Sequence, residues 1–498
     1  MLSQVFSAVF RPDVLCLIFI GVVIGNIFGC IPGLNAPIAI ALALPITFVL
    51  NSFQSVALII GLYMGCTAGG LISAILLKIP GTAANVATTF DGYPMAQQGK
   101  ATEALSYGSF ASLFGGMFSS VVLLLMAPIL ANLALQFGPW EYFGTALLAL
   151  IMVCTLMGER MLKGFIAVCF GLLFTCVGLS PVDGVALRYT FGSTALDSGF
   201  NLIVVIVGIF ALPELISNSN KMDDTVLQAT VKRRKFYVPT LATVKRNLKV
   251  MLNGSILGTF IGILPGMGGG AASLISYEQA RRTSAHPELF GTGYEEGIFC
   301  CESANNATTG GALVPMLALG VPGDTASAVI MGALMLQGVT PGPLLSMDNS
   351  LLFNSVFLIV FLANLLMWVF QASTIRWMAK IAVVPKYILF PIVALFCIAG
   401  TISIRNNPFD LAFLMLFGII GYILSKNDYP LAPFILAFIL GEFVESNLRR
   451  AITYYGSFGG CLKVPSIGTL FFFLAVALPI ISVARRIYAS RQKAKKKA

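Results

Sequence analysis

The chain has 498 residues, of which 57% are hydrophobic and only 10% charged, and its formal net charge is +10. Soluble globular proteins carry about 25% charged residues, so this composition excludes a soluble protein and predicts an integral membrane protein. No charged residue occurs from Val14 to Leu77, a run far longer than the roughly 20 residues of one membrane-spanning helix. A β-barrel is excluded, because its strands alternate apolar and polar residues in segments of about 10.

Apolar segments in the first half of the chain predict helical elements, some of them half-helices, at 14–32, 35–50, 55–77, 104–136, 140–157, 164–180 and 199–217. Those in the second half lie at 250–265, 268–280, 297–319, 350–372, 387–403, 409–425, 430–446 and 464–484. We expect an all-α polytopic membrane protein with roughly 12–15 membrane segments.

Two sets of Gly and Pro residues occur twice along the chain. The first copy of the first set is Gly21, Gly25, Gly29, Pro32 and Gly33. The second copy has the same residues at the same spacing, at Gly254, Gly258, Gly262, Pro265 and Gly266. The first copy of the second set is Pro80-Gly81-Thr82 with Gln98-Gly99. The second copy is Pro322-Gly323-Asp324-Thr325 with Gln337-Gly338. Helix breakers at matching places in two halves of a membrane protein are typical of a secondary transporter.

Basic residues gather in two polar segments, a linker at 219–249 and a tail at 485–498. Both flank apolar spans, so the positive-inside rule places them, and with them the C-terminus, in the cytoplasm. Because the basic residues flank apolar spans, nucleic-acid binding is excluded as their role, although the tail can also contact anionic lipid headgroups. We therefore divide the chain into a first transmembrane repeat at 1–218, the linker, a second transmembrane repeat at 250–484, and the tail.

Loop charge predicts that the two repeats have inverted topology. Arg11 is the one basic residue before the first Gly motif, whereas the linker before the second motif carries eight. Lys78 and Lys100 flank the first Pro-Gly hairpin, whereas residues 320–349 contain no Lys or Arg. By the same charge rule the first hairpin lies near the cytoplasm and the second near the periplasm. Both hairpins are then re-entrant, and the helices that lead into them are broken.

Each Gly motif combines a helix-packing stripe with a helix break. Glycines four residues apart leave one bare helix face, and the Pro-Gly pair then ends the helix. A helix that restarts after the break points free N–H groups at an anion. A tightly packed kink without a ligand is the alternative, but two copies in opposite orientation favour a substrate site. It would contain Pro32, Gly33 and Asn35 with Pro265, Gly266 and Gly268.

The hairpin motifs carry small polar side chains after the break. We expect them to bind substrate carboxylates through Pro80, Gly81, Thr82, Asn85, Pro322, Gly323, Thr325 and Ser327. Asp324 is an ionisable residue in an apolar region, which marks a functional site. It can equally be the N-cap of the next helix, and both roles can hold together.

A polar stretch precedes the second hairpin, and its counterpart in the first repeat contains Thr67. Its polar residues begin at Glu302, and they are costly in a membrane unless they are paired or wetted. Na⁺ ligation or hydrogen bonding between helices explains them. The candidate Na⁺ ligands are Thr67, Asn305, Asn306, Thr308 and Asp324. Near the end of a later helix, we expect Glu442 and Glu445 to pair with Arg449 and Arg450.

Two other classes of function fit these patterns less well. A channel also has broken helices, but paired inverted breaks favour alternating access around one central site. An intramembrane enzyme would need a catalytic group at depth, and we predict that the protein is not an enzyme. The one histidine, His286, lies in a polar loop, and Asp410, the possible second Asp beside Asp324, stands at a helix start. The ten cysteines form no Cys-x-x-Cys and are interpreted as small buried hydrophobic residues.

A longer set of motifs carries a family resemblance. The motifs are Gly-x-x-Pro-Gly-Leu at Gly29–Leu34, Lys78-Ile-Pro-Gly-Thr, Phe90-Asp-Gly-Tyr-Pro-Met with Gln98-Gly-Lys, Ile263-Leu-Pro-Gly-Met-Gly, Leu319-Gly-Val-Pro-Gly-Asp and Pro341-Gly-Pro. Together they span about residues 14–450, and they resemble the large membrane subunit of the tripartite tricarboxylate transporters.

The resemblance implies a multi-pass carrier of the bacterial inner membrane. It would work with a small four-helix membrane subunit and a periplasmic solute-binding protein, and an oligomer is compatible with it. It would import citrate-like tri- and dicarboxylates on a Na⁺ or H⁺ gradient, with no cofactor besides the coupling cation. The absence of a Walker-type Gly-x-x-x-x-Gly-Lys-Ser/Thr from the sequence agrees with a carrier that does not use ATP. A carboxylate-permeable channel and a carrier for another small organic anion remain the alternatives.

Overall fold

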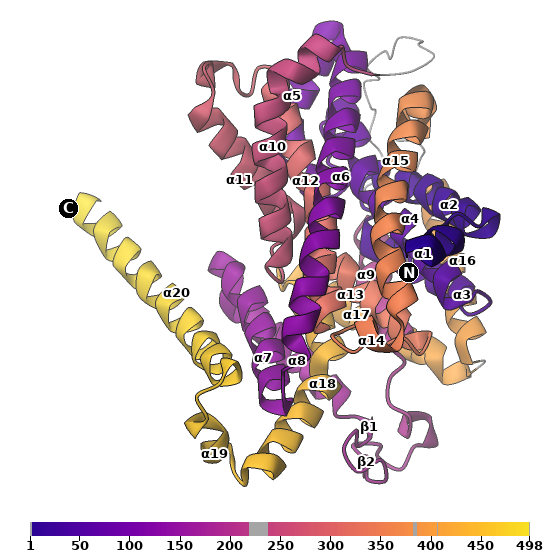
Figure 1. The fold of residues 1–498 in the computed structure, drawn as a ribbon, viewed down its shortest axis with the longest axis vertical. Helices are drawn as coiled ribbons and strands as arrows, with labels where there is room; N and C mark the ends of the chain where they lie inside the picture. The colour runs from indigo at the N-terminus through magenta and orange to yellow at the C-terminus, as the bar shows by residue number, and fades with distance from the viewer. Residues whose placement is uncertain (1, 219–237, 382–385, 406, 498) are drawn as a thin grey trace.

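The computed structural model describes residues 2–218, 238–381, 386–405 and 407–497. The chain is almost entirely helical and forms an elongated bundle (Figure 1). The predicted basic linker falls outside the described residues at 219–237, and the side chains of the tail also lie outside them. The predicted all-α membrane class is confirmed.

The longer described helices follow the predicted apolar segments, whereas the short described strands were not predicted. In the first half they are α1 (Leu2–Val9), α2 (Pro12–Cys30), α3 (Ala36–Thr47), α4 (Ser52–Leu77), η1 (Ala83–Asn85), α5 (Thr88–Met95), η2 (Ala96–Lys100), α6 (Ala101–Ala134), α7 (Pro139–Leu156), η3 (Gly158–Arg160), α8 (Met161–Thr175), β1 (Gly178–Leu179), β2 (Leu187–Arg188), η4 (Thr194–Leu196) and α9 (Leu202–Asn218). In the second half they are α10 (Leu241–Ile263), α11 (Gly268–Thr283), η5 (Pro287–Leu289), α12 (Glu295–Leu319), α13 (Thr325–Leu336), α14 (Leu345–Asp348), α15 (Ser350–Ile381), α16 (Lys386–Arg405), α17 (Pro408–Lys426), α18 (Leu431–Tyr455), α19 (Phe458–Lys463) and α20 (Ile467–Lys497).

Eight helical stretches in the described part of the chain are long and apolar enough to cross a membrane, and four shorter apolar helices accompany them. The 25-residue helix α12 is not among the eight, although it is buried for nearly its whole length. Its middle carries the polar stretch from Glu302 to Thr309, which lowers its hydropathy. The total of 12–15 membrane segments stays a prediction.

The bare glycine stripes bring helix backbones into direct contact in both repeats. A Cβ atom on Gly25 of α2 would lie 2.4 Å from the carbonyl oxygen of Leu62 in α4, and one on Gly258 of α10 would lie 2.1 Å from that of Ala304 in α12. Gly21, Gly29, Gly254 and Gly262 make the same kind of contact one turn away. The α2–α4 pair and the α10–α12 pair therefore pack in the same way, as the repeated sequence predicts.

The hairpins that follow these pairs also have matching geometry. Lys78 and Gly320 end α4 and α12 in the left-handed conformation, with φ of 59° and 70°. The amide of Gly81 then donates to the carbonyl of Gly70 at 3.4 Å, and the amide of Gly323 donates to that of Ala312 at 3.3 Å. The two hairpins therefore share their local backbone geometry as well as their sequence motif.

The two repeats hold each other through a pair of reciprocal contacts. Gln98 Nε2 donates to the carbonyl of Thr292 in the second repeat at 2.7 Å. Gln337 Nε2 donates to the carbonyl of Thr47 in the first repeat at 2.6 Å. This exchange fits a pseudo-two-fold arrangement, and the opposite orientation of the two copies in a membrane stays a prediction.

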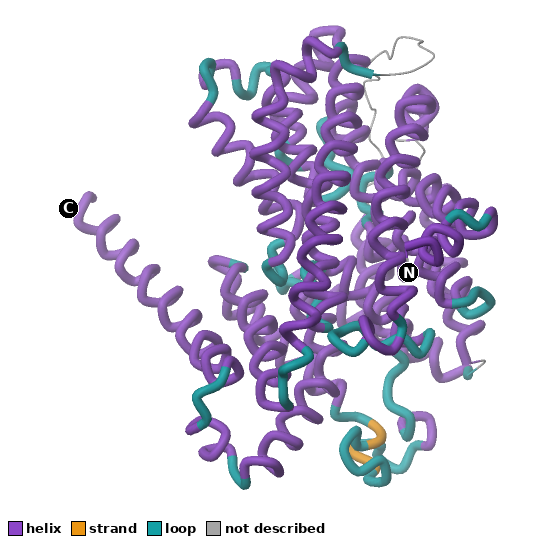
Figure 2. The backbone as a smooth tube through the Cα atoms, in the orientation of Figure 1, coloured by secondary structure: helices purple, strands orange, loops and turns teal. Residues whose placement is uncertain are grey.

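The remaining helices surround this core. The long helix α6 packs along α12, and α15 packs against α6, α4 and α2. The pairs α9–α17 and α8–α18 continue the bundle, whereas α20 contacts α7 and then runs away from the main body (Figure 1, yellow). Figure 2 shows one short antiparallel β1–β2 pair in the loops at the lower end.

Replacing Gly258 with Ala should destabilise the protein, because the new methyl group would press on the Ala304 carbonyl. We expect the free energy of unfolding to fall by about 1–3 kcal/mol, the usual cost of overpacking. Thermal unfolding of the detergent-purified chain measures the loss. Gly459→Ala in α19 is the control, because the nearest atom to its new Cβ is 4.0 Å away. Equal midpoints for the two variants would contradict the packing argument.

Candidate functional site

All four chain breaks meet at one cavity of about 300 Å³. Its lining includes the residues at which α3, η1, α11 and α13 begin. The lining residues are Asn35, Ala36, Pro37, Tyr63, Thr67, Thr82, Ala83, Ala84, Phe210, Gly266, Met267, Gly268, Gly269, Gly270, Asn305, Thr308, Asp324, Thr325, Ala326 and Ala432. The repeated breaks therefore converge in space, from segments far apart in the sequence.

The first pair of breaks leaves two different helix starts at the cavity. Gly33 and Gly266 both take positive φ values, of 97° and 84°, which turn the chain back toward the cavity. The side chain of Asn35 caps α3, because its Oδ1 accepts a hydrogen bond from the Ile38 amide at 3.2 Å. Helix α11 has no side-chain cap, so its first N–H groups, at Gly268 and beyond, are available to a ligand.

The glycines at the start of α11 also keep the cavity open. A Cβ on Gly269 would lie 2.7 Å from Asn305 Oδ1 and 2.8 Å from the Ala84 methyl group. Because no side chain stands there, a ligand can approach the backbone N–H groups closely. An uncapped helix N-terminus that ends at a cavity favours an anion electrostatically.

The second pair of breaks places side-chain oxygens at the cavity. Thr82 Oγ1 donates to Asn85 Oδ1 at 2.6 Å. Asp324 Oδ1 accepts from the Ser327 amide at 2.7 Å, and Ser327 Oγ accepts from the Asp324 amide at 2.9 Å. This capping box confirms that Asp324 is the N-cap of α13.

Asp324 also has a second partner across the cavity, because Tyr63 Oη donates to its Oδ2 at 2.7 Å. Tyr63 is not among the site residues that the sequence predicts. Its signal was its spacing, since Tyr63 and Thr67 stand four residues apart on α4 and share one helix face. The capping role therefore leaves one oxygen of the carboxylate for contacts on the cavity side.

The candidate cation ligands separate into two groups. Thr67, Asn305, Thr308 and Asp324 line the cavity. Asn305 Nδ2 donates to the Thr67 carbonyl at 3.3 Å, whereas its buried Oδ1 has no hydrogen-bond partner among the described residues. Asn306 does not line the cavity and turns toward α6, where its Nδ2 donates to Ser112 Oγ at 2.8 Å.

The other predicted site residues lie outside the cavity lining, and two of them pack the hairpins against the preceding helices. A Cβ on Gly81 or Gly323 would meet the carbonyl oxygen of Gly29 or Gly262, at 2.1 and 2.4 Å. Their bare backbones thus lock each hairpin onto the preceding helix pair. Outside the lining lie Pro32, Gly33, Pro80, Gly81, Asn85, Pro265, Asn306, Pro322, Gly323 and Ser327.

The cavity lining is poor in charge, since Asp324 is its one acidic or basic residue. Backbone N–H groups and hydroxyls would therefore meet an anion, and amide, hydroxyl and carboxylate oxygens would meet a cation. Cations prefer such oxygen ligands where they bind at broken helices. The arrangement can hold an anion and a cation side by side.

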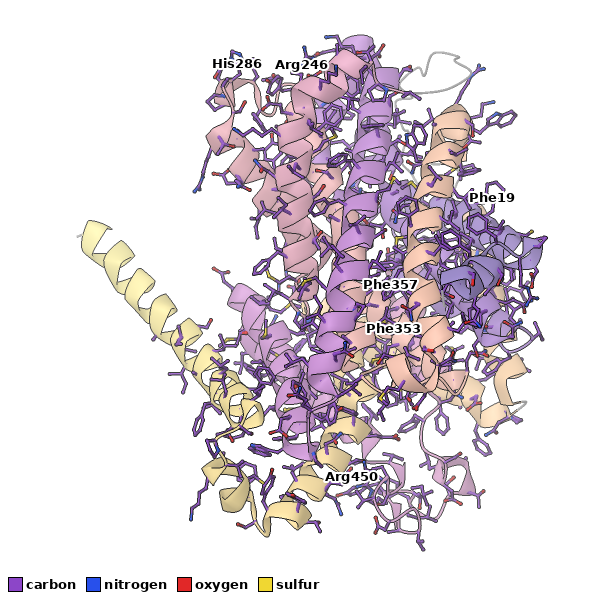
Figure 3. All side chains as sticks on the ribbon, in the orientation of Figure 1. Phe19, Arg246, His286, Phe353, Phe357 and Arg450 are labelled. Atoms are coloured by element: carbon purple, nitrogen blue, oxygen red, sulfur yellow. The ribbon has the colours of Figure 1, made fainter. Side chains whose placement is uncertain are left out.

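Three labelled side chains mark the two ends of the bundle. His286 and Arg246 lie at one end and Arg450 at the other (Figure 3). The predicted ion pairing is confirmed for Glu445, whose Oε1 lies 2.9 Å from Arg449 and 2.7 Å from Arg188. Glu442 and Arg450 instead line a separate cavity of about 450 Å³ beside the second hairpin.

Comparison with known proteins identifies relatives. The model of the tripartite tricarboxylate transporter TctA family matches residues 15–436. The chain is 36% identical over 451 residues, 91% of its length and 89% of the other, to an "Uncharacterized 52.8 kDa protein in TAR-I ttuC' 3'region" of Agrobacterium vitis. It is 38% identical over 195 residues, 39% of its length and 81% of the other, to an "Uncharacterized protein in TAR-II ttuC' 3'region" of the same organism. No solved structure matches the chain.

Thiol labelling tests the cavity directly. We expect Thr325→Cys to react with a charged, membrane-impermeant thiol reagent, because Thr325 is half-buried and lines the cavity. Ala328→Cys, one helical turn along α13, should stay unlabelled, because Ala328 is 1% exposed and does not line it. The test is made in a background in which the exposed Cys16 and Cys169 are replaced by Ser. Equal labelling would show that the cavity is wrongly placed.

Proposed function

Because the chain belongs to the tripartite tricarboxylate transporter TctA family, we propose that it is the large membrane subunit of a binding-protein-dependent secondary transporter. It imports citrate-like tri- and dicarboxylates across the bacterial inner membrane, with its C-terminus in the cytoplasm. A Na⁺ or H⁺ gradient drives the import, and no enzymatic step takes part. The membrane character rests on the apolar helices.

One observation carries the proposal, which is the convergence of four chain breaks on a single polar cavity. In secondary transporters, paired discontinuous helices direct their N-termini at anionic groups of the substrate. Here the uncapped start of α11 meets one carboxylate, and the hydroxyls of Thr82 and Thr325 lie beside it. The volume of about 300 Å³ suits a small organic anion.

The charge of the cavity supports coupling to a cation. A carboxylate that enters an apolar bundle needs compensating charge, and the lining contains no Lys or Arg. A cation bound to Thr67, Asn305, Thr308 and Asp324 would supply that charge next to the anion. The orphaned Oδ1 of Asn305 is the ligand that most clearly needs a partner. Substrate and cation then bind together, and this mutual requirement couples their movement.

The proposed partners follow from the tripartite family name. A periplasmic solute-binding protein delivers the substrate, and a small four-helix membrane subunit completes the complex. Alternating access arises when the broken segments move relative to the rest of the bundle.

Transport by the reconstituted complex in proteoliposomes tests the function. We expect uptake of di- and tricarboxylates that saturates and requires an inward Na⁺ or H⁺ gradient. Thr325→Ala should lower uptake about tenfold, because a hydrogen bond to a charged group contributes about 1.5–3 kcal/mol. Thr453→Ala, at an exposed position on α18, is the control. Currents that rise linearly with voltage would indicate a channel, and uptake of only other organic anions would indicate the second alternative.

The cation assignment has its own test, Asp324→Asn. The Asn side chain can still accept the hydrogen bond that caps α13, so the protein should stay folded while the charge is lost. We expect weaker dependence of uptake on the cation. Full uptake with unchanged cation dependence in Asp324→Asn would show that the assignment of the cation to the cavity is wrong.

A further inference from the structure

The polar residues of α12 occupy two faces of the helix. Asn305 and Thr308 face the cavity. Glu302 and Asn306, four residues apart and so on one face, do not line it and contact α6 and the first hairpin instead. The structure therefore contains a second buried polar cluster, formed by Glu302, Asn306, Ser112, Asn85 and Thr88.

Glu302 is the centre of this cluster and is fully buried. Its Oε1 accepts hydrogen bonds from Asn85 Nδ2 at 2.9 Å and from Thr88 Oγ1 at 2.5 Å. Its Oε2 accepts one from Ser112 Oγ at 3.2 Å. These donors are all neutral, so the described contacts give the carboxylate hydrogen bonds without an opposite charge.

A second buried carboxylate, Asp91, shows how hydrogen bonds from the backbone can satisfy a buried negative charge in the same protein. Its Oδ1 accepts three backbone N–H bonds, from Gly291, Gly293 and Tyr294, at 2.8–2.9 Å. Its Oδ2 accepts the Tyr277 hydroxyl at 2.8 Å. Aligned backbone amides form an anion-binding nest that stabilises a negative charge. Glu302 has no such nest among its described hydrogen bonds.

Asn306, one helical turn from Glu302, carries a buried oxygen without a partner in the described part of the chain. Its Nδ2 donates to Ser112 Oγ and to the backbone carbonyl of Glu302, whereas its Oδ1 has no hydrogen-bond partner among the described residues. Asn306 is 1% exposed. A buried oxygen is normally hydrogen-bonded, so this one, on the same helix face as the buried Glu302, calls for a partner such as a bound ion or a water molecule.

We propose that Glu302, Asn306 and Ser112 form a Na⁺ site that is separate from the substrate cavity. The carboxylate supplies the charge, and the amide and hydroxyl oxygens supply neutral ligands. One carboxylate matches a monovalent cation, since Ca²⁺ sites usually draw on several acidic residues. The described residues contain no group of three or more His, Cys, Asp or Glu that could hold another metal.

Asn85 connects this site to the cavity. It donates to Glu302 at 2.9 Å and accepts from Thr82, which lines the cavity, at 2.6 Å. Gly70 makes room for the Asn85 side chain, because a Cβ atom on residue 70 would lie 2.1 Å from Asn85 Oδ1. The cation therefore sets the orientation of Asn85, and Asn85 sets that of the Thr82 hydroxyl. This coupling step rests on the proposed function of the cavity, whereas the ion site does not.

Thermal unfolding of the purified full chain tests the site. NaCl is titrated against choline chloride at constant ionic strength. We expect saturable stabilisation of the wild type by Na⁺, as for any ligand that binds the folded state. Glu302→Gln, which keeps the shape and removes the charge, should raise the half-saturating Na⁺ concentration at least about tenfold, because the buried cation then loses its one charged partner.

Two control variants separate the site from general effects of a lost carboxylate. Asp91→Asn removes another buried carboxylate, and Glu288→Gln removes an exposed one. Asp91→Asn should be less stable at every salt concentration, but both variants should keep the wild-type half-saturation. Asn306→Ala should raise it, and this variant decides the matter if Glu302→Gln does not fold.

Two results would overturn the proposal. One is a wild type that Na⁺ stabilises no more than choline does. The other is a half-saturating concentration that neither Glu302→Gln nor Asn306→Ala changes. Na⁺ binding that depends on Glu302, in a complex that moves no carboxylate, would leave the ion site standing and refute the proposed function.

Discussion

Direct contact between helix backbones is the constraint on which the rest of the structure depends. Gly25 against Leu62 and Gly258 against Ala304 place two pairs of helices closer together than any side chain would allow. Each pair then fixes the hairpin that follows it, because Gly81 and Gly323 lie on the carbonyls of Gly29 and Gly262. The four chain breaks meet at one cavity because both pairs hold their hairpins in the same way.

The polar centre of α12 would be costly in a membrane helix if it faced lipid, and the fold resolves this cost by burying it completely. One face of the helix gives Asn305 and Thr308 to the cavity, and the other gives Glu302 and Asn306 to a cluster with α6 and the first hairpin. The same helix thus lines the cavity with one face and the Glu302 cluster with another.

The two repeats have the same framework, but the residues at their helix starts differ. Gln98 and Gln337 make equivalent contacts with the opposite repeat. The helix starts are unequal, because Asn35 caps α3 and Asp324 caps α13, whereas α11 has no side-chain cap. Of the three α-helices that start at the cavity, α11 therefore leaves the most N–H groups to a ligand.

The sequence by itself determined the membrane class, the duplication, the chain breaks and the capping role available to Asp324, because composition, spacing and Gly-Pro chemistry are local properties. Only the tertiary structure decided which polar residues share a site. Nothing local distinguishes Asn305 from Asn306, yet one reaches the cavity and the other reaches Ser112. Tyr63 and Glu302 gained their partners from segments more than 200 residues away. Helix rotation and packing set such contacts, and no single segment of the chain encodes them.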